Sequence, residues 1–392
     1  MPHALILSAC RTAIGRFRGG LSSLPATDLG AIVLREAVAQ ANLSPTEVDE
    51  VILGNVLTGG TGQAPARQAA LRAGLPPTVA ALTINKVCGS GLKSVMLAAQ
   101  AVRCGDAELI VAGGMESMSR AGLVLPRESP ALGDRNLTDT LMHDGLTCAF
   151  SNLSMGVIAE QLAEQDGIMR DEQDKFALQS HRRAVAAIES GAFAAEIVPV
   201  RIRKGSDESQ FFRDECPRSD TSLERLAKLS SAFRKNGSVT AGNSSAISDG
   251  AAAVVVASEA IAARLTKRPL ARILAMATSG GEPQDLFIAP VEAIRRAVAA
   301  SGHSMGDIDL FEINEAFAVQ VLACVRRLGL SLDRVNADGG AIALGHPIGG
   351  SGARVLVTLL HAMQRRDCRL GVAALCLGGG NAVAMVVEST NQ

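Results

Sequence analysis

The same order of strand and helix patterns occurs twice along this chain, once near each end. In the first 120 residues, short apolar runs alternate with stretches whose apolar residues recur three or four positions apart. These patterns predict strands at 4–9, 51–55 and 109–112 and helices at 29–41, 66–73 and 92–103. Such alternation is typical of α/β proteins in which helices cover a largely parallel sheet.

The second occurrence begins near residue 271. It predicts strands at 273–277, 310–313, 372–375 and 383–387 and helices at 291–300, 316–327 and 350–364. An apolar run at 251–257 supplies the last strand that the first occurrence lacks. The sequence therefore predicts one α/β unit used twice.

Residues 119–248 lie between the halves and do not follow the same alternation of strand and helix patterns. They combine polar loops at 126–139, helical patterns at 155–163 and 172–188, and a charged stretch at 201–222. The basic excess over 201–235, nine basic against six acidic residues, fits a solvated loop and a site for a phosphorylated ligand equally well. We expect an insertion with a small fold of its own.

Charge and cysteine usage narrow the function classes. Lys and Arg (38) nearly balance Asp and Glu (39), so no global field favours nucleic acid or a membrane surface. The eight cysteines form no C-x-x-C pair, and the first residues lack the pattern of a signal peptide. No apolar run has the length of a membrane span, and the last residues are not a peroxisomal signal. We expect free thiols and a cytoplasmic protein.

Cys88 lies among glycines just before the helix predicted at 92–103. A helix N-terminus favours a thiolate, and flanking glycines leave backbone N–H groups free to bind an oxyanion. Cys88 therefore fits a nucleophile, although a buried structural cysteine fits the same pattern. If the halves pack about a pseudo-twofold axis, the loop of Cys88 meets the loop of His346, a base for its proton.

Two further residues extend this chemistry. Cys376 follows the strand predicted at 372–375 and precedes three glycines. It could lie on a tight turn and remove a proton from an α-carbon, or the turn could be purely structural. Asn314 ends a predicted strand and could fix a water or an oxyanion, whereas capping the next helix is the simpler interpretation.

Other motifs are absent. The glycine-rich run at 339–352 contains no G-x-G-x-x-G with an acidic partner, which makes a dinucleotide dehydrogenase a weak rival. Walker A, G-x-S-x-G and H-E-x-x-H patterns do not occur either.

These motifs, in this order, resemble those of the thiolases over nearly the whole chain, from Arg11 onward. The matching stretches are NKVCGSG at 85–91, GGMESMS at 113–119, VTAGN at 239–243, DGAA at 249–252, NEAFA at 314–318, the run 336–352 and CLGGG at 376–380. The resemblance implies duplicated βαβαβαββ units in a layered α/β/α/β/α core. It places one core half at 1–118 and 249–270, a loop domain at 119–248 and the second half at 271–392.

The resemblance also implies roles. Cys88 would accept the acyl group, His346 would activate it and donate to an oxyanion, and Cys376 would be the acid/base at the α-carbon. Asn314 would hold a water in one oxyanion hole, and the N–H groups of Cys88 and Gly378 would form the other. The loop domain would bind coenzyme A through Met155, Phe317, Phe233, Ala241, Ser245 and, near the adenine nucleotide, Arg218. Acyl-CoA and coenzyme A would be substrates, with no metal or permanent cofactor, in a homodimer or homotetramer.

Five positions depart from the thiolase pattern: Ser154, Ala246, Ser248, Asn381 and Ala382. We expect them along the acyl or pantetheine path, where they affect substrate identity. The expected activity is reversible condensation of acyl-CoA with acetyl-CoA, with acetoacetyl-CoA favoured because residues 87–91 resemble the acetoacetyl-CoA thiolases. The alternatives are a broader or branched-chain 3-ketoacyl-CoA thiolase of fatty acid degradation, a decarboxylating ketosynthase and a coenzyme A-binding protein without turnover.

Overall fold

The computed structural model describes residues 3–125, 127, 132, 134–204 and 207–390. The strands are β1 (Ala4–Thr12), β2 (Gly15–Arg16), β3 (Glu50–Gly54), β4 (Ala80–Ile84), β5 (Leu109–Ser117), β6 (Leu123–Val124), β7 (Thr138–Asp139), β8 (Ile197–Val198), β9 (Val200–Lys204), β10 (Asp207–Phe211), β11 (Ser248–Ser258), β12 (Ala271–Gly280), β13 (Leu310–Ile313), β14 (Leu370–Leu377) and β15 (Asn381–Ser389). The helices are α1 (Ala26–Gln40), α2 (Pro65–Ala73), α3 (Ser90–Cys104), α4 (Met155–Gln165), α5 (Arg170–Glu189), α6 (Leu223–Ala227), α7 (Glu259–Ala263), α8 (Ala289–Ala300), α9 (Ala318–Leu328), α10 (Ala341–Leu344) and α11 (Ile348–Arg365).

The two halves share one strand order. The first half runs β1-β11-β5-β3-β4 and the second β12-β15-β14-β13. In both, the first three strands pair antiparallel and the next pair is parallel. The counterpart of β4 is reduced to one parallel bridge between Phe311 and Val335. The predicted duplication is therefore confirmed down to strand direction.

A repeated carboxylate contact marks the same symmetry. Asp49 accepts hydrogen bonds from the backbone N–H groups at the start of β5, at 2.8 and 2.9 Å. Asp309 does the same at the start of β14, at the same two distances. Each carboxylate satisfies N–H groups that a strand end would otherwise leave unpaired.

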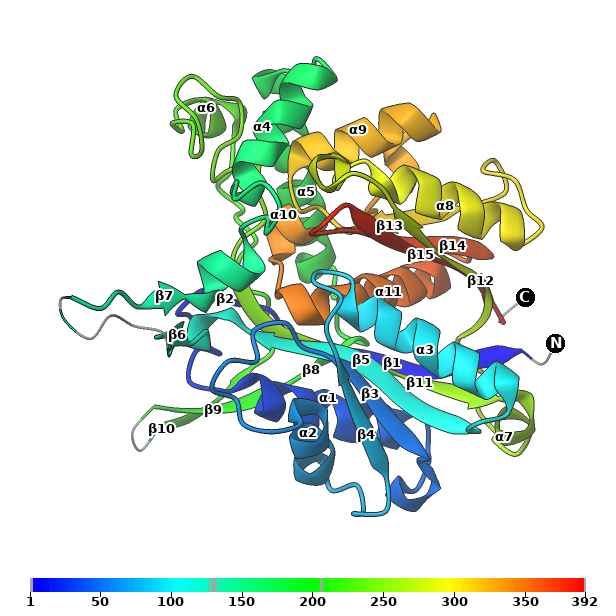
Figure 1. Ribbon diagram of the computed structural model, residues 1–392. Coiled ribbons are helices and arrows are strands. Elements are labelled where there is room, and N and C mark those ends of the chain that lie inside the picture. Colours follow the sequence, from blue (N-terminus) through cyan, green and yellow to red (C-terminus); the bar gives the residue numbers. More distant parts are fainter. Residues whose placement is uncertain (1–2, 126, 128–131, 133, 205–206, 391–392) are drawn as a thin grey trace.

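The elements stack in five layers (Figure 1). Helices α8 and α9 cover the second-half sheet, α1 and α2 cover the first-half sheet, and α3 and α11 lie between the two sheets. Within the described part of the chain, the sheets join where Ala4–Ile6 of β1 pairs with Ala271–Ile273 of β12. Apolar cores fill the spaces between layers, and the central one packs α3 and α11 against both sheets. This is the predicted α/β/α/β/α core.

Segment 119–248 is tied to the first half by a buried charge cluster. The fully buried guanidinium of Arg11 on β1 bonds Glu196 at 2.6 Å and Asp214 at 2.8 and 2.9 Å. One arginine with five donors can bind both carboxylates at once, which makes the burial of three charges tolerable, although Glu196 Oε2 is buried without a partner among the described residues.

Four local expectations differ from the structure. Strand β4 was not expected, because its five residues do not alternate strictly and it lies at a sheet edge. The helix expected from residue 316 begins at Ala318, after an extended Phe317. Part of the charged stretch at 201–222 forms the β9–β10 hairpin instead of a loop. Cys376 lies within β14 rather than on the turn, which begins at Gly378. Part of the loop expected at 126–139 lies outside the described residues.

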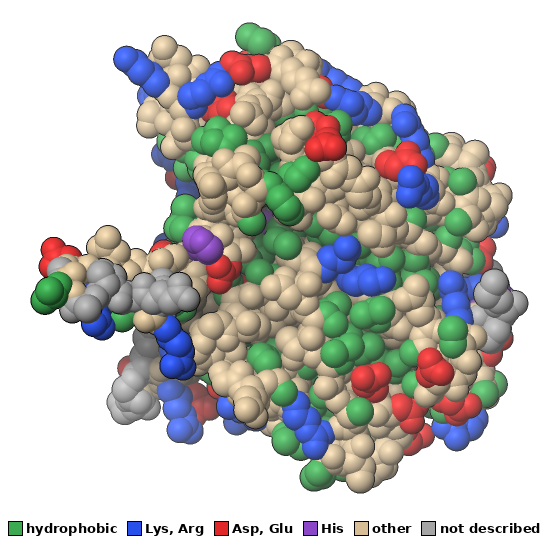
Figure 2. Space-filling view, viewed as in Figure 1, with side chains coloured by type: hydrophobic (Ala, Val, Ile, Leu, Met, Phe, Trp, Pro, Cys, Tyr) green, Lys and Arg blue, Asp and Glu red, His purple; other side chains and the backbone are tan. Residues whose placement is uncertain are grey.

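The face of the molecule shown in Figure 2 carries no large patch of one charge. Figure 2 shows acidic and basic side chains intermixed around the edges, and apolar side chains exposed over α3 and β4. Among the described residues, no helix is long and apolar enough to cross a membrane. All eight cysteines are free thiols, as expected.

Candidate active site

Cys88 sits in a tight turn between β4 and α3. Gly89 is the N-cap of α3, and Val87 adopts a φ of +48°. A β-branched residue rarely takes this conformation, and such strain is concentrated at functional sites. The Ser90 hydroxyl holds the turn, because it donates to the Val87 carbonyl at 2.7 Å and accepts from the Lys86 N–H at 2.8 Å.

The turn packs directly on the end of β14. A Cβ added at Gly89 would lie 2.2 Å from the side chain of Leu377, so only glycine permits this approach. The approach places Cys376 close enough that a charge on Cys88 raises its pKa. The N–H groups of Gly378, in the turn after β14, and of Cys88 itself are close enough to the Cys88 sulfur to lower its pKa. Both cysteines and Gly378 therefore converge.

The resting Cys88 is a thiol, contrary to the thiolate expected from its place before a helix. Burial raises the pKa of Cys88 to about 12, and the two N–H bonds lower it by less. Desolvation of a thiolate thus outweighs the local dipoles here. Burial also raises the pKa of Cys376 well above its ordinary value. Both sulfurs need a proton acceptor before they react.

His346 lies on the other side of the site, just before α11. Its backbone N–H bonds the Ala246 carbonyl at 2.9 Å and the Ser248 hydroxyl at 3.3 Å. Its Nδ1 lies 2.6 Å from the hydroxyl of Ser351. Burial, and next the charge of Arg354, lower the pKa of His346 to about 3, so the ring is neutral. Ala246 and Ser248 thus support His346 instead of lying only along the pantetheine path.

Asn314 follows β13 and is fully buried. Its Nδ2 lies 3.5 Å from His346 Nε2, and its Oδ1 accepts from Arg354 at 3.4 Å. The N-cap of α9 is Phe317, so the helix-capping interpretation of Asn314 is wrong. The chain needs three more residues to turn from β13 into α9, which frees the Asn314 amide for the site.

The Cys88 and His346 loops lie side by side through Ile348, which packs in one apolar cluster with Cys88. The buried carboxylate of Glu116 on β5 reinforces this junction. It accepts the N–H of Gly349 at 2.9 Å, those of Val56 and Leu57 at 3.1 and 3.3 Å, and the Asn55 amide at 2.7 Å. Burial raises the pKa of Glu116 to about 7.

Sequence reasoning missed four polar residues that support the site: Glu116, Glu312, Ser351 and Arg354. The matching motifs contain or adjoin them, but nothing in spacing alone shows that their side chains turn inward. In the structure each of these residues is at most 3% exposed. This burial is what distinguishes them from solvated polar residues.

The expected coenzyme A residues fall into two places. Met155 packs in the same apolar cluster as Phe317, and the Phe233 ring meets that of Phe317 edge-on at 6.1 Å. Ser245 joins them, because its N–H bonds the carbonyl next to Phe317 at 3.0 Å, while Ala241 is exposed on the same segment. Arg218 is exposed and contacts α5 instead, where its N–H bonds His181 at 3.2 Å.

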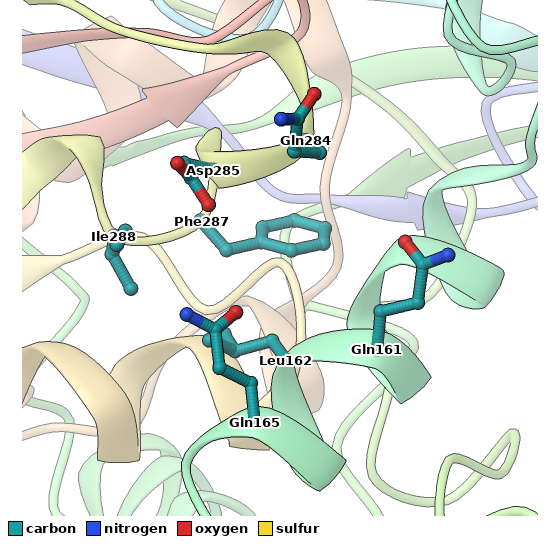
Figure 3. Close-up of a pocket in the computed structure, with 7 residues that line it drawn as sticks. All are labelled: Gln161, Leu162, Gln165, Gln284, Asp285, Phe287 and Ile288. Carbon is teal, nitrogen blue, oxygen red and sulfur yellow. The ribbon is translucent and has the colours of Figure 1, made fainter.

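A cavity of about 80 Å³ lies between α4 and the segment before α8 (Figure 3). None of the residues that line the cavity is an expected catalytic residue. The lining residues are Gln161, Leu162, Gln165, Gln284, Asp285, Phe287 and Ile288. It is linked to the aromatic cluster through Phe287, whose ring meets Phe317 edge-on at 5.3 Å. No group of side chains suited to a metal ion occurs among the described residues.

Comparison with known proteins identifies the family. The domain described as "Thiolase, N-terminal domain" matches residues 4–260, and "Thiolase, C-terminal domain" matches residues 267–389. The chain therefore belongs to the thiolase family, and the resemblance seen in the sequence is confirmed.

Relatives match over their full length. The chain is 54% identical to an acetyl-CoA acetyltransferase of Pseudomonas aeruginosa, over 99% of both chains. It is 52% identical to one of Escherichia coli strain K12, over 100% of both. A crystal structure of the Bacillus anthracis acetyl-CoA acetyltransferase, 43% identical, superimposes with a TM-score of 0.97 over 99% of both chains.

Proposed function

We propose that this thiolase is an acetyl-CoA C-acetyltransferase that joins two acetyl-CoA molecules into acetoacetyl-CoA and, in reverse, cleaves acetoacetyl-CoA with coenzyme A. The observation that carries the proposal is that the Cys376 thiol and the Gly378 N–H both lie close to the Cys88 sulfur. The names of the full-length relatives support the same substrate.

In the first half-reaction, His346 Nε2 takes the Cys88 proton. The thiolate adds to the thioester carbonyl, and its oxygen gains the negative charge. The N–H groups of Cys88 and Gly378, already aimed at the sulfur, stabilise that oxygen. The C–S bond to coenzyme A then breaks, and the leaving thiolate takes a proton from Cys376. Acetyl-Cys88, a Cys376 thiolate and a protonated His346 remain.

In the second half-reaction, Cys376 removes a proton from the methyl group of a second acetyl-CoA. The enolate oxygen is stabilised by the Nε2–H of His346 and by a water held by Asn314. In the resting site Asn314 Nδ2 donates only weakly to His346 Nε2, across 3.5 Å, so once Nε2 is protonated both N–H groups are available to an oxygen. The enolate carbon attacks acetyl-Cys88, and the departing Cys88 thiolate takes back its proton from His346, which restores the resting site.

Segment 119–248 acts as the coenzyme A-binding loop domain between core halves 1–118 with 249–270 and 271–392. The pantetheine lies against Met155, Phe233 and Phe317, with Ser245 and Ala241 beside it. Support comes from the edge-on aromatic contact and from a Cβ-free Gly156, where a side chain would lie 2.2 Å from the Phe233 ring. Arg218 is the exposed cation for the nucleotide phosphates.

The protein works as a cytoplasmic homodimer or homotetramer in fatty acid metabolism, without a permanent cofactor. Support for self-association comes from β4, which is an edge strand with an exposed Leu82, and from the exposed Leu123 and Val124 of the β6–β7 hairpin. Exposed apolar edge strands invite pairing with another chain.

One assay set separates the proposal from its rivals. The chain should cleave acetoacetyl-CoA in the presence of coenzyme A without malonyl-CoA. A requirement for malonyl-CoA would indicate a decarboxylating ketosynthase, and binding without turnover would indicate a non-catalytic protein. A higher kcat/KM for long or branched 3-oxoacyl-CoA would replace acetoacetyl-CoA by the broader degradative substrate class.

A further inference from the structure

The geometry points to Arg354 as a positioning residue: its guanidinium fixes the orientation of the Asn314 amide and, through that amide, the proton position on His346. The inference rests on the proposed function, since it concerns how the same site is prepared for proton transfer.

Arg354 reaches the site from α11. Its side chain is 2% exposed, its Nη1 lies 3.0 Å from Glu312 Oε1 and its Nη2 lies 3.4 Å from Asn314 Oδ1. Glu312 and Asn314 are two positions apart at the end of β13, so they project to the same face of the sheet. The flat, forked guanidinium can bind both at once, which the single ammonium of lysine does less well.

In the series of hydrogen bonds from Arg354 through Asn314 and His346 to Ser351, each residue donates to the next. A guanidinium only donates, so Asn314 must present Oδ1 to it and turn Nδ2 toward His346. An amide N–H facing Nε2 favours the tautomer with a lone pair on Nε2 and the proton on Nδ1. Nδ1–H then donates to Ser351, whose hydroxyl donates to the Pro347 carbonyl at 2.9 Å. Nε2 is thereby left as the base that Cys88 requires.

The charge of Arg354 acts in the same sense. It lowers the pKa of His346 and so keeps the ring unprotonated and able to accept the Cys88 proton. Arg354 interacts with the charges of Glu312 on β13 and Glu315 in the loop after it, and these carboxylates also interact with Arg183 on α5 and, for Glu312, with Asp338 before α10. Glu315 is already held by Ser180 and Asn336, and Asp338 by Arg365 and Arg366.

Arg354 does not satisfy all of its own hydrogen bonds. Its Nε is buried without a partner, an arrangement that costs folding free energy. A core arginine kept only for stability would be expected to use every donor, as Arg11 uses Nε and both Nη groups. The orphaned Nε fits a side chain whose position is set by Asn314 and Glu312 together.

Two substitutions separate the effect of the two-pronged guanidinium contact of Arg354 from the effect of its positive charge. Arg354→Lys keeps the positive charge but loses the two-pronged contact, and Arg354→Gln loses both. Arg365→Gln is the matched control, because it removes another arginine of α11 whose partner, Asp338, also binds Arg366. For each protein we would measure kcat and KM for acetoacetyl-CoA cleavage, the pH dependence of Cys88 acetylation, and the circular dichroism melt.

We expect kcat to fall about 100-fold in both Arg354 variants with KM nearly unchanged, as for misplacement of a reacting group by about 1 Å. The acid limb of acetylation should move to higher pH in Arg354→Gln, because His346 protonates more easily, and stay in place in Arg354→Lys. Arg365→Gln should match the wild type.

A folded Arg354→Gln with wild-type kcat and an unmoved acid limb would overturn the inference. If Arg354→Gln does not fold, a wild-type kcat in Arg354→Lys overturns it equally. A wild type that does not cleave acetoacetyl-CoA at all would instead refute the proposed function, which is a distinguishable result.

Discussion

A partly exposed thiol, Cys88, and a buried thiol, Cys376, lie side by side in this site, and their surroundings give them different chemistry. Cys88 has two N–H groups aimed at its sulfur and a strained turn that exposes it to the substrate side. Cys376 lies within β14 in an apolar cluster, next to Cys88 and near the buried Cys324. A thiol with stabilised negative charge suits attack on a carbonyl, whereas an apolar thiol suits brief proton transfer.

The first prediction separates the two roles. Cys376→Ser should still take an acetyl group on Cys88 but lose most condensation and cleavage, by about 100-fold or more in kcat, because only proton transfer at the α-carbon is impaired. Rapid-quench acetylation and steady-state turnover measured on the same preparation test this. Near-normal turnover in Cys376→Ser would contradict the two-thiol account.

Ser154 adds a prediction about substrate breadth. Its hydroxyl accepts from the Val157 N–H at 3.4 Å and so caps α4, a role the sequence did not indicate. Replacing it by histidine should fill space near Met155 and lower kcat/KM for 2-methylacetoacetyl-CoA and 3-oxohexanoyl-CoA more than for acetoacetyl-CoA. One methylene corresponds to about 1–3 kcal/mol of discrimination.

Ser154→Ala is the control for this change, because it removes the cap, at about 1 kcal/mol, but leaves the space open. It should keep the wild-type ratio of the three substrates. Equal ratios in Ser154→His and wild type would show that this position does not shape the acyl pocket.

At the scale of elements, two glycines let α3 and α11 cross in close contact between the sheets. A Cβ at Gly91 would lie 2.6 Å from the Ala353 nitrogen, and one at Gly352 would lie 2.3 Å from the Leu92 nitrogen. Both obstacles are backbone, which cannot rotate away. The crossing brings the starts of the two helices, and hence Cys88 and His346, to one place.

Gly352→Ala should therefore destabilise the protein by about 1–3 kcal/mol, the usual cost of overpacking a core, and lower activity as the helices separate. Gly306→Ala is the matched control, since the nearest atom to its added Cβ would be 3.6 Å away. Urea unfolding of both variants measures the difference. A Gly352→Ala protein as stable as Gly306→Ala would contradict the close crossing.

The duplicated α/β pattern and the motifs around Cys88, Asn314, His346 and Cys376 could be read from the sequence because apolar periodicity and glycine runs are local signals. Strand β4 and the β9–β10 hairpin could not, since a short edge strand and a charged hairpin lack a clear apolar alternation. The protonated state of Cys88 could not be predicted from the sequence either. It depends on burial by β14, a contact nearly 300 residues away in the chain.

At the scale of the whole molecule, the pH dependence of stability includes His181 on α5, which joins two parts of the inserted segment. Its Nδ1 accepts the Arg218 N–H, and burial, then the charge of Arg218, lower its pKa from 6.5 to about 4. The unfolded chain therefore binds a proton that the folded chain refuses. Stability from this group is complete above pH 6.5 and is lost as the pH falls toward 4.

Between pH 6.5 and pH 4, His181 should lower the unfolding free energy of the wild type by up to about 3 kcal/mol. The His181→Gln variant should not show this part of the loss. Urea unfolding at a series of pH values, in wild type and variant, measures the two slopes. Parallel slopes would show that His181 is not buried as a neutral ring. The variant should keep its activity at neutral pH, where the ring is already uncharged.

The claim that unites these scales is that acetyl passes through Cys88. The direct measurement is intact-protein mass spectrometry after rapid acid quench with acetoacetyl-CoA, followed by peptide mapping. The account predicts one acetyl group per chain on the peptide of Cys88 in wild type and Cys376→Ser, and none in Cys88→Ala. An adduct that persists in Cys88→Ala, or that maps stably to Cys376, would contradict it.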